Sequence, residues 1–182
     1  MRWEDRSAKE RHRPPHEVTA GTALFITAAT VRRIPYLGSA SRRDGFLALL
    51  QSECERFEMD LIAWVVLKEH YHLVMVPGHP EVFEPWITSI HSNSARPLNE
   101  EEGTPGRQVW YQYWDTTLWT EGDLWSRISY VHRNPVKHGY VDDPADWPWS
   151  SYRQMAEYLA SEDAVTRIAR FPAPRKLPHD DF

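Results

Sequence analysis

The sequence has only one cysteine, Cys54, in 182 residues. A single cysteine excludes a disulfide framework within the chain and fits a reducing compartment. No apolar run approaches the roughly 20 residues that a membrane helix needs. The opening segment, MRWEDRSAKERHRPP, lacks the apolar stretch that is typical of a secretion signal. We therefore expect a protein of the bacterial cytoplasm.

The sequence also lacks an excess of positive charge, because its net charge is −5. The charge is unevenly distributed, and residues 1–50 carry nine Lys and Arg against five Asp and Glu. Binding a phosphate backbone needs a local positive stripe rather than a positive total. The pairs Arg32–Arg33 and Arg42–Arg43 flank the first predicted strand-to-helix connection, so we predict that they contact DNA. The common alternative is a solvated surface of mixed charge.

Apolar patterning predicts an α+β fold, with a central antiparallel sheet of four to five strands covered by helices. Runs rich in β-branched and aromatic residues predict strands at 22–31, 60–67, 71–76 and 108–118. Helical spacing predicts helices at 41–57, 80–96, 120–134 and 151–169. Ser41 is the expected N-cap of the first, and Thr120 or its neighbour that of the third. Residues 97–107 are predicted to form a long loop.

Nine tryptophans are unusual for this length, and the segment QVWYQYWDTTL at 108–118 gathers several aromatic residues. Strict alternation would place Trp110 and Trp114 on one face of this strand, and Tyr113 and Asp115 on the other. Such rings can stack on unpaired bases, or they can fill a core between sheet and helix. Asp115 is a candidate for orienting a metal site from outside the ligand set.

Two histidines stand two residues apart in the apolar stretch AWVVLKEHYHLVMV, residues 63–76. On a strand, His70 and His72 would project from the same face, with Cβ atoms about 7 Å apart. Both imidazoles could then reach one metal ion. The alternative is a pair of ordinary core or surface histidines, because a lone His-x-His pair is a weak pattern. Glu69 is either a further oxygen ligand or, as we expect, exposed to solvent.

A second polar group lies in LWSRISYVHRNPVKHGYV, residues 124–141. On a helix, Tyr130 and Asn134 would share a face because they are four residues apart. Pro135 predicts that this helix ends at about Asn134, since the residue before a proline disfavours helical geometry. A phenol beside a carboxamide is consistent with plain packing. Combined with the paired histidines, it suggests a nucleophile beside a third metal ligand.

Together these stretches resemble the REP-associated tyrosine transposases, a branch of the single-tyrosine transposases within the HUH nuclease superfamily. The matching segments are AWVVLKEHYHLV and YVHRNPVKHGYVDDPADWPWSSY, with a looser match at LFITAATVRR. The resemblance covers residues 20–155. One position departs from the pattern: Lys68 stands where many members carry a proline, which should alter the turn and leave the ligands in place.

The resemblance implies a metal-dependent single-stranded DNA endonuclease and strand transferase that acts at hairpins of palindromic repeats. Tyr130 would be the catalytic nucleophile, leaving a 5′-phosphotyrosine and a free 3′-hydroxyl. His70, His72 and Asn134 would hold a divalent ion, either Mg²⁺, which prefers oxygen ligands, or Mn²⁺, which imidazole favours. The alternative function is a non-cutting DNA-binding regulator with the same fold. We expect a monomer that associates with the nucleoid.

The resemblance also implies a ferredoxin-like or RRM-like architecture, with residues 21–155 as the transposase domain. Composition predicts a polar arm at residues 1–20, and a C-terminal helix and proline-rich tail at 156–182. Arg127 lies three residues before Tyr130 and could hold a phosphate. We expect His132 and His138 to serve packing or the surface, and Tyr140 to be structural.

Overall fold

The computed structural model describes residue 18 and residues 21–175. The predicted N-terminal arm, apart from Val18, therefore lies outside the described residues, as do residues 176–182 of the predicted tail. Within the described part of the chain, no helix combines the length and the apolar character needed to cross a membrane.

The described residues form one antiparallel sheet of four strands in the order β2-β3-β1-β4. The strands are β1 (Ala23–Thr30), β2 (Met59–Val66), β3 (His70–Pro77) and β4 (Trp110–Leu118). Helices α1 (Ala40–Arg56) and α2 (Phe83–Glu101) connect them in the chain order β1-α1-β2-β3-α2-β4. This connectivity and strand order are ferredoxin-like, so the predicted α+β class is confirmed.

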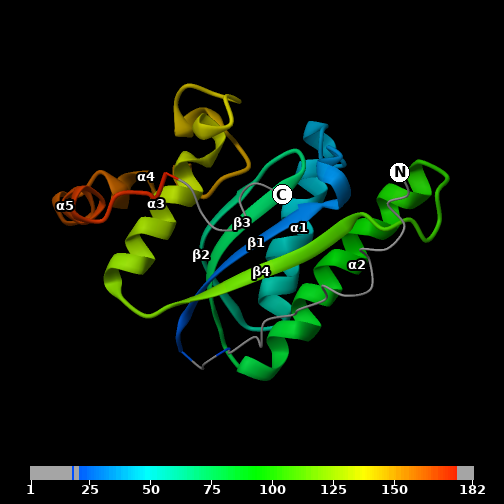
Figure 1. Cartoon of the computed structure of the whole chain (residues 1–182), viewed down its shortest axis with the longest axis horizontal. Helices are drawn as coiled ribbons and strands as arrows, with labels where there is room; N and C mark the ends of the chain where they lie inside the picture. The colour runs from blue at the N-terminus through cyan, green and yellow to red at the C-terminus, as the bar shows by residue number, and fades with distance from the viewer. Residues whose placement is uncertain (1–17, 19–20, 176–182) are drawn as a thin grey trace, which may run out of the picture.

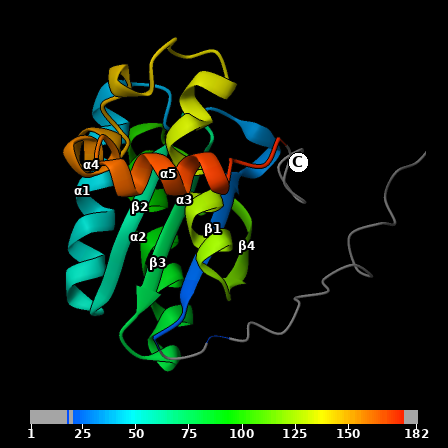
Figure 2. The ribbon, with the colours of Figure 1, turned by 90° about the vertical axis from the view of Figure 1, so that its left-hand side faces the viewer.

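The two faces of the sheet are covered by different parts of the chain (Figures 1 and 2). One face packs against α1 and α2, and the other packs against α3 (Glu121–Lys137). Helices α4 (Tyr152–Leu159) and α5 (Glu162–Arg170) pack against α3. Short 3-10 turns complete the described part of the chain: η1 (Val31–Arg33), η2 (Pro80–Val82) and η3 (Pro144–Asp146).

Strand β3 divides its side chains between two cores. Tyr71, Leu73 and Met75 belong to the core under α1 and α2. The intervening Val74 belongs to the core under α3. Because successive side chains on a strand point to opposite faces, His70 and His72 share the face of Val74. The α3 helix therefore closes over the histidine side of the sheet.

Several predicted helix bounds are wrong. The N-cap of α1 is Ser39, whose hydroxyl accepts from the backbone of Arg42 at 3.2 Å, and not Ser41. Helix α2 continues through Pro97 to Glu101, into the region predicted as a loop. The predicted helix at 151–169 is two helices, since Ser161 interrupts it and caps α5.

The end of α3 departs from the sequence prediction in a way that matters for the site. The helix passes through Pro135 and ends at Lys137. Proline removes only one backbone donor here, and its ring is buried. The end is then closed by Gly139 (φ +69°), with Gly139 N–H donating to Val136 and Tyr140 N–H donating to Pro135, both at 3.0 Å. This is the Schellman pattern, which satisfies the last carbonyls of a helix.

Strand β4 contains a bulge that overturns its predicted alternation. Ala28 pairs with Tyr113 and Thr30 with Trp110, so two steps on β1 correspond to three on β4. Trp110 and Tyr113 consequently both pack on the α1–α2 core. Asp115 pairs with Ile26, a residue of that same core, and so lies on the face opposite the histidines. The prediction that Asp115 orients the metal site is therefore wrong.

Candidate active site

The two predicted metal-binding histidines lie side by side on β3. The ring centroids of His70 and His72 are 5.0 Å apart with an interplanar angle of 77°. Both side chains are buried. The predicted shared face is confirmed, because strand alternation brings the two rings together beneath α3. Metal binding by this pair stays a prediction.

His72 is held from the neighbouring strand β1. Thr27 pairs with it in the register, and the Thr27 hydroxyl lies 2.8 Å from His72 Nδ1. Its ring also stacks on Phe25, with centroids 5.6 Å apart. Burial lowers the pKa of His72 well below its usual value, and the nearby His70 adds to the effect. The ring is therefore neutral, and Nε2 is the nitrogen that could coordinate a metal.

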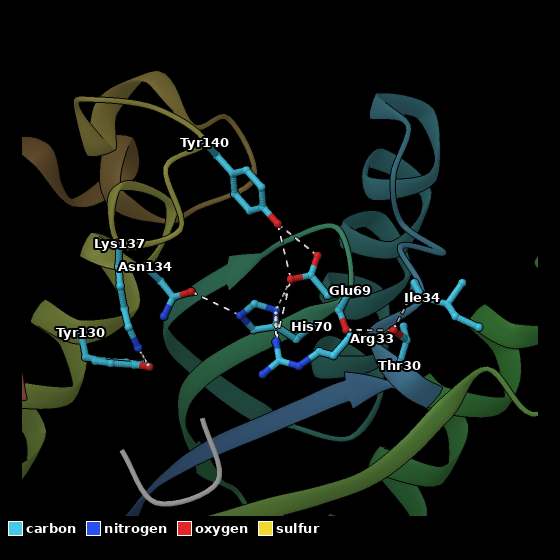
Figure 3. A network of polar contacts seen from close by, with 9 residues as sticks. All are labelled: Thr30, Arg33, Ile34, Glu69, His70, Tyr130, Asn134, Lys137 and Tyr140. Atoms are coloured by element: carbon cyan, nitrogen blue, oxygen red, sulfur yellow. Dashed lines mark hydrogen bonds and ion pairs between the residues drawn. The ribbon is translucent and has the colours of Figure 1, made fainter. Parts of the chain in front are cut away.

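Nδ1 of His70 has two neighbours, one a hydrogen-bond donor and the other an acceptor (Figure 3). Arg33 Nη1 lies 3.0 Å away and can only donate, whereas Glu69 Oε1 lies 3.1 Å away and can only accept. Nδ1 can satisfy one of them at a time. If Nδ1 accepts from Arg33, the ring proton is on Nε2. If Nδ1–H donates to Glu69, Nε2 carries a lone pair and becomes a possible metal ligand.

Glu69 is built into the site rather than exposed, so the expectation that it faces solvent is wrong. Its side chain is only 14% exposed, and it accepts a hydrogen bond from the Tyr140 hydroxyl at 3.1 Å. Arg33 lies 3.8 Å from it. Burial raises the pKa of Glu69, but the hydrogen bond from His70 and the other contacts outweigh it and leave the pKa below the usual value. Glu69 is therefore a carboxylate that favours the Nδ1–H form of His70.

Asn134 reaches the histidines from α3. Its Oδ1 lies 3.4 Å from His70 Nε2, and the side chain is buried. The contact joins residues 64 positions apart in the sequence. In the Nδ1–H form of His70, this Nε2 lone pair faces the Asn134 oxygen, and two acceptors that face each other favour a cation between them.

Tyr130 lies one helical turn before Asn134 on the same face of α3. Its ring is buried, 5.3 Å from the ring centroid of His72. Its hydroxyl accepts a hydrogen bond from Lys137 Nζ at 3.0 Å. A capping box between Thr120 and Asp123 starts this helix, as the sequence predicted for Thr120. The predicted nucleophile and the predicted ligands therefore lie together.

Arg42 and Arg43 have different surroundings although they are adjacent. The Arg42 guanidinium forms ion pairs of 2.8–2.9 Å with two glutamates at the end of α2. Arg43 is buried, donates to the carbonyls of Leu37 (2.7 Å) and Gly38 (2.9 Å), and lies 3.8 Å from a ring centroid of Trp149. The prediction that Arg43 contacts DNA does not agree with this burial, and we assign it a structural role.

The other predicted DNA-contacting arginines lie nearer the site. Arg32 and Arg33 both have left-handed backbone angles, φ 54° and 55°. This geometry sends Arg33 to His70 and leaves Arg32 exposed. The Arg127 guanidinium lies 5.3 Å from the ring centroid of Phe25, on the same side of the sheet as Tyr130. DNA contact by Arg32, Arg33, Arg42 and Arg127 stays a prediction.

The sequence prediction missed two site residues because it ended α3 too early. Lys137 contacts Tyr130, and the ring of His138 lies 4.9 Å from that of His70. His138 was expected at the surface or in packing. A helix continued past Pro135 would have placed both residues beside the predicted nucleophile. His132, by contrast, is buried and bonds the Ser151 hydroxyl at 2.8 Å, as expected of a packing residue.

The donor set that could hold a metal is two imidazoles and one carboxamide. Among the described residues, no group of three or more His, Cys, Asp and Glu side chains is arranged to bind an ion. The candidate set differs from such groups because its third member is Asn134. Three neutral donors leave the full charge of a divalent ion available to an anionic ligand.

The described residues form an antiparallel α+β sandwich in which the strand that carries His70 and His72 faces the helix that carries Tyr130, as the resemblance of the sequence led us to expect. No family model matches the chain. The chain is 29% identical over 129 residues to a Haemophilus influenzae protein assigned to the REP-associated tyrosine transposases, a match that covers 65% of this chain and 73% of the relative.

An Escherichia coli K12 REP-associated tyrosine transposase is 26% identical over 163 residues, which covers 88% of this chain and 94% of the relative. Over most of its length the chain is therefore similar to REP-associated tyrosine transposases. A solved structure of a REP-associated tyrosine transposase bound to a REP hairpin shares the fold, with a TM-score of 0.63 and 23% identity over 91% of each chain.

Proposed function

We propose that this protein is a DNA-cleaving tyrosine transposase that cuts single-stranded DNA beside a hairpin and joins the cut strand to Tyr130. The observation that carries the proposal is the convergence of Tyr130 and Asn134 from α3 with His70 and His72 from β3. The names of the relatives support the type of enzyme. The hairpin in the related solved structure supports the class of substrate.

The proposed reaction is an exchange of one phosphodiester for another. The Tyr130 oxygen forms a bond to phosphorus and loses its proton, while the bond from phosphorus to the 3′ oxygen breaks. The 3′ oxygen takes up a proton, leaving a free 3′-hydroxyl and a 5′-phosphotyrosine. Because the ester bond energy is conserved, a 3′-hydroxyl can later reverse the step and rejoin a strand.

The site residues fit the divalent metal that this chemistry calls for. Two ligands that are each about 2.1 Å from one ion lie about 3 Å apart, close to the 3.4 Å between His70 Nε2 and Asn134 Oδ1. His72 is neutral and is hydrogen-bonded to Thr27 at Nδ1, which leaves Nε2 as the nitrogen that could coordinate the ion. A bound Mg²⁺ or Mn²⁺ would offset the charge that develops on the scissile phosphate.

The remaining residues prepare the ligands. Glu69 accepts a hydrogen bond from Nδ1–H of His70 and so holds the tautomer in which Nε2 can coordinate. Tyr140 donates to the other oxygen of the Glu69 carboxylate and keeps it in place. Arg33 loses its acceptor on His70 in this tautomer and stays near Glu69. The exposed Arg32 beside it is suited to a DNA phosphate.

A single-stranded substrate follows from the burial of the nucleophile. Tyr130 is 2% exposed, and its ring lies on the sheet-facing side of α3, next to Phe25 and His72. A regular duplex would have to open to bring one phosphate against this hydroxyl. We further propose that one protomer is sufficient, since the described part of a single chain supplies the nucleophile and all three candidate ligands.

The test is covalent capture of a labelled hairpin oligonucleotide that carries a single-stranded flank. With Mg²⁺ or Mn²⁺ present, the protein should give a band of lower mobility on a denaturing gel, and peptide mass spectrometry should place the DNA on Tyr130. Tyr130→Phe removes only the hydroxyl and should abolish the adduct while hairpin binding persists. Tyr158→Phe, at an exposed tyrosine of α4, is the matched control and should keep the adduct.

Two outcomes would contradict the proposal. If Tyr130→Phe still forms the adduct, the nucleophile lies elsewhere. If the unaltered protein binds the hairpin and never forms an adduct at any metal concentration, the protein is a non-cutting DNA-binding regulator with the same fold.

A further inference from the structure

The last turn of α3 brings a cation to the oxygen of the candidate nucleophile. Tyr130 and Lys137 are seven residues apart, two helical turns, so they project from one face. Lys137 Nζ donates to the Tyr130 hydroxyl at 3.0 Å, and it lies 4.9 Å from the ring centroid. The ammonium therefore contacts the oxygen rather than the centre of the ring.

This contact depends on the unusual end of the helix. Had α3 stopped at Asn134, the chain would have turned away before Lys137. The helix instead continues through Pro135, and the closing bonds of Gly139 and Tyr140 fix its last turn. The final turn thus gives Lys137 a defined place beside the site.

We propose that Lys137 is a further catalytic residue, which holds the Tyr130 oxygen in position and stabilises the charge that develops there in both directions of strand transfer. The inference rests on the function proposed above. In cleavage, the Oη–P bond forms and the P–O3′ bond breaks, and the incoming phosphate brings negative charge beside Lys137. A fixed ammonium lowers the cost of that charge.

In rejoining, the roles of the two oxygens reverse. A 3′-hydroxyl attacks the phosphotyrosine, the new P–O3′ bond forms, and the P–Oη bond breaks. The electron pair of that bond goes to the Tyr130 oxygen, which receives a proton, and the proton of the attacking hydroxyl is released. Because Lys137 already donates to this oxygen, it stabilises the departing phenolate. An effect on both rates distinguishes this role from simple attraction of DNA.

Exposure sets the expected size of the effect. Lys137 is exposed in the described structure, so water screens its charge before substrate binds. Bound DNA would exclude part of that water and strengthen the contact. Losing one well-placed donor in a buried catalytic site costs about 10²–10³ in rate. For this partly screened site we expect a loss of about 10- to 100-fold.

The experiment compares Lys137→Met, Lys137→Arg and Arg133→Met. Arg133 is also exposed on α3, where it lines a hollow with His132, Val136 and Tyr152. Its variant therefore removes the same charge from the same helix. Covalent adduct formation is timed at saturating hairpin DNA with Mn²⁺, and rejoining is timed after adding an oligonucleotide with a 3′-hydroxyl. Hairpin affinity is measured separately without metal.

Lys137→Met should slow both steps by about 10- to 100-fold with hairpin affinity changed less than threefold. Lys137→Arg should recover most of the rate, and Arg133→Met should match the unaltered protein. The inference is overturned if Lys137→Met keeps both rates, or if it lowers only the affinity. Failure of the unaltered protein to form any adduct would instead overturn the proposed function, so the two failures are distinguishable.

Discussion

Replacing Glu69 by glutamine should weaken metal binding although Glu69 is not itself a ligand in our proposal. The carboxylate lies 3.1 Å from His70 Nδ1 and is fixed by the Tyr140 hydroxyl, also at 3.1 Å. Glutamine is nearly the same size but carries no charge. His70 can then accept from Arg33, 3.0 Å from Nδ1, which places the ring proton on Nε2 where the metal would bind.

The magnitude follows from the loss of an outer partner of a metal-bound histidine. Removing such a partner costs about 10- to 100-fold in metal affinity, or about 1.4–2.7 kcal/mol. Glu69 serves His70 alone among the proposed ligands, since His72 is held by Thr27. A loss of metal affinity near 10-fold, the lower end of that range, is expected if the glutamine oxygen still accepts a hydrogen bond from Nδ1–H of His70.

The assay is titration of the metal-free protein with Mn²⁺, followed by calorimetry and by the electron paramagnetic resonance signal of free Mn²⁺. Glu84→Gln, at an exposed carboxylate of α2, makes the same chemical change away from the site and should leave the affinity unchanged. Equal affinities in Glu69→Gln and the unaltered protein would refute the tautomer argument. Circular dichroism of the metal-free variants would distinguish a loss of the fold from a specific loss of metal affinity.

Two further predictions concern stability. Burial lowers the pKa of His91 to about 3. Between pH 6.5 and pH 3 the unfolded chain takes up a proton at His91 that the folded chain does not, so the free energy of unfolding decreases as the pH is lowered. When the pH is lowered from 7 to 5, His91→Gln should lose about 2 kcal/mol less free energy of unfolding than the unaltered protein, as measured by urea unfolding. Arg43→Ala should lower the free energy of unfolding by about 2–4 kcal/mol while the salt dependence of DNA binding stays unchanged. A smaller slope of log affinity against log salt concentration in Arg43→Ala would indicate that Arg43 contacts DNA after all.

The sequence by itself determined the features that depend on local geometry. A strand places residues two apart on one face, so His70 and His72 could be paired before any fold was known. A helix places residues four apart on one face, which paired Tyr130 with Asn134. The capping residue Thr120 was likewise local. These patterns depend only on the periodicity of a strand or a helix, and that periodicity is contained within one short segment of the chain.

Tertiary structure decided which of these segments meet and which charges are buried. The contact between His70 and Asn134 closes across 64 residues, and no local pattern specifies it. Glu69 and Arg43 carry charges that normally face water. Partners from distant segments bury them here: Tyr140 for Glu69, and a Trp149 ring for Arg43.

The end of α3 shows the same division most clearly. Local sterics favour ending the helix before Pro135. The buried proline ring, the buried Asn134 and the closing bonds after Gly139 outweigh that preference in the folded chain. Packing energy gained over many contacts exceeds the cost of one missing backbone hydrogen bond. For that reason the sequence located the candidate nucleophile, while only the fold placed Lys137 at its oxygen.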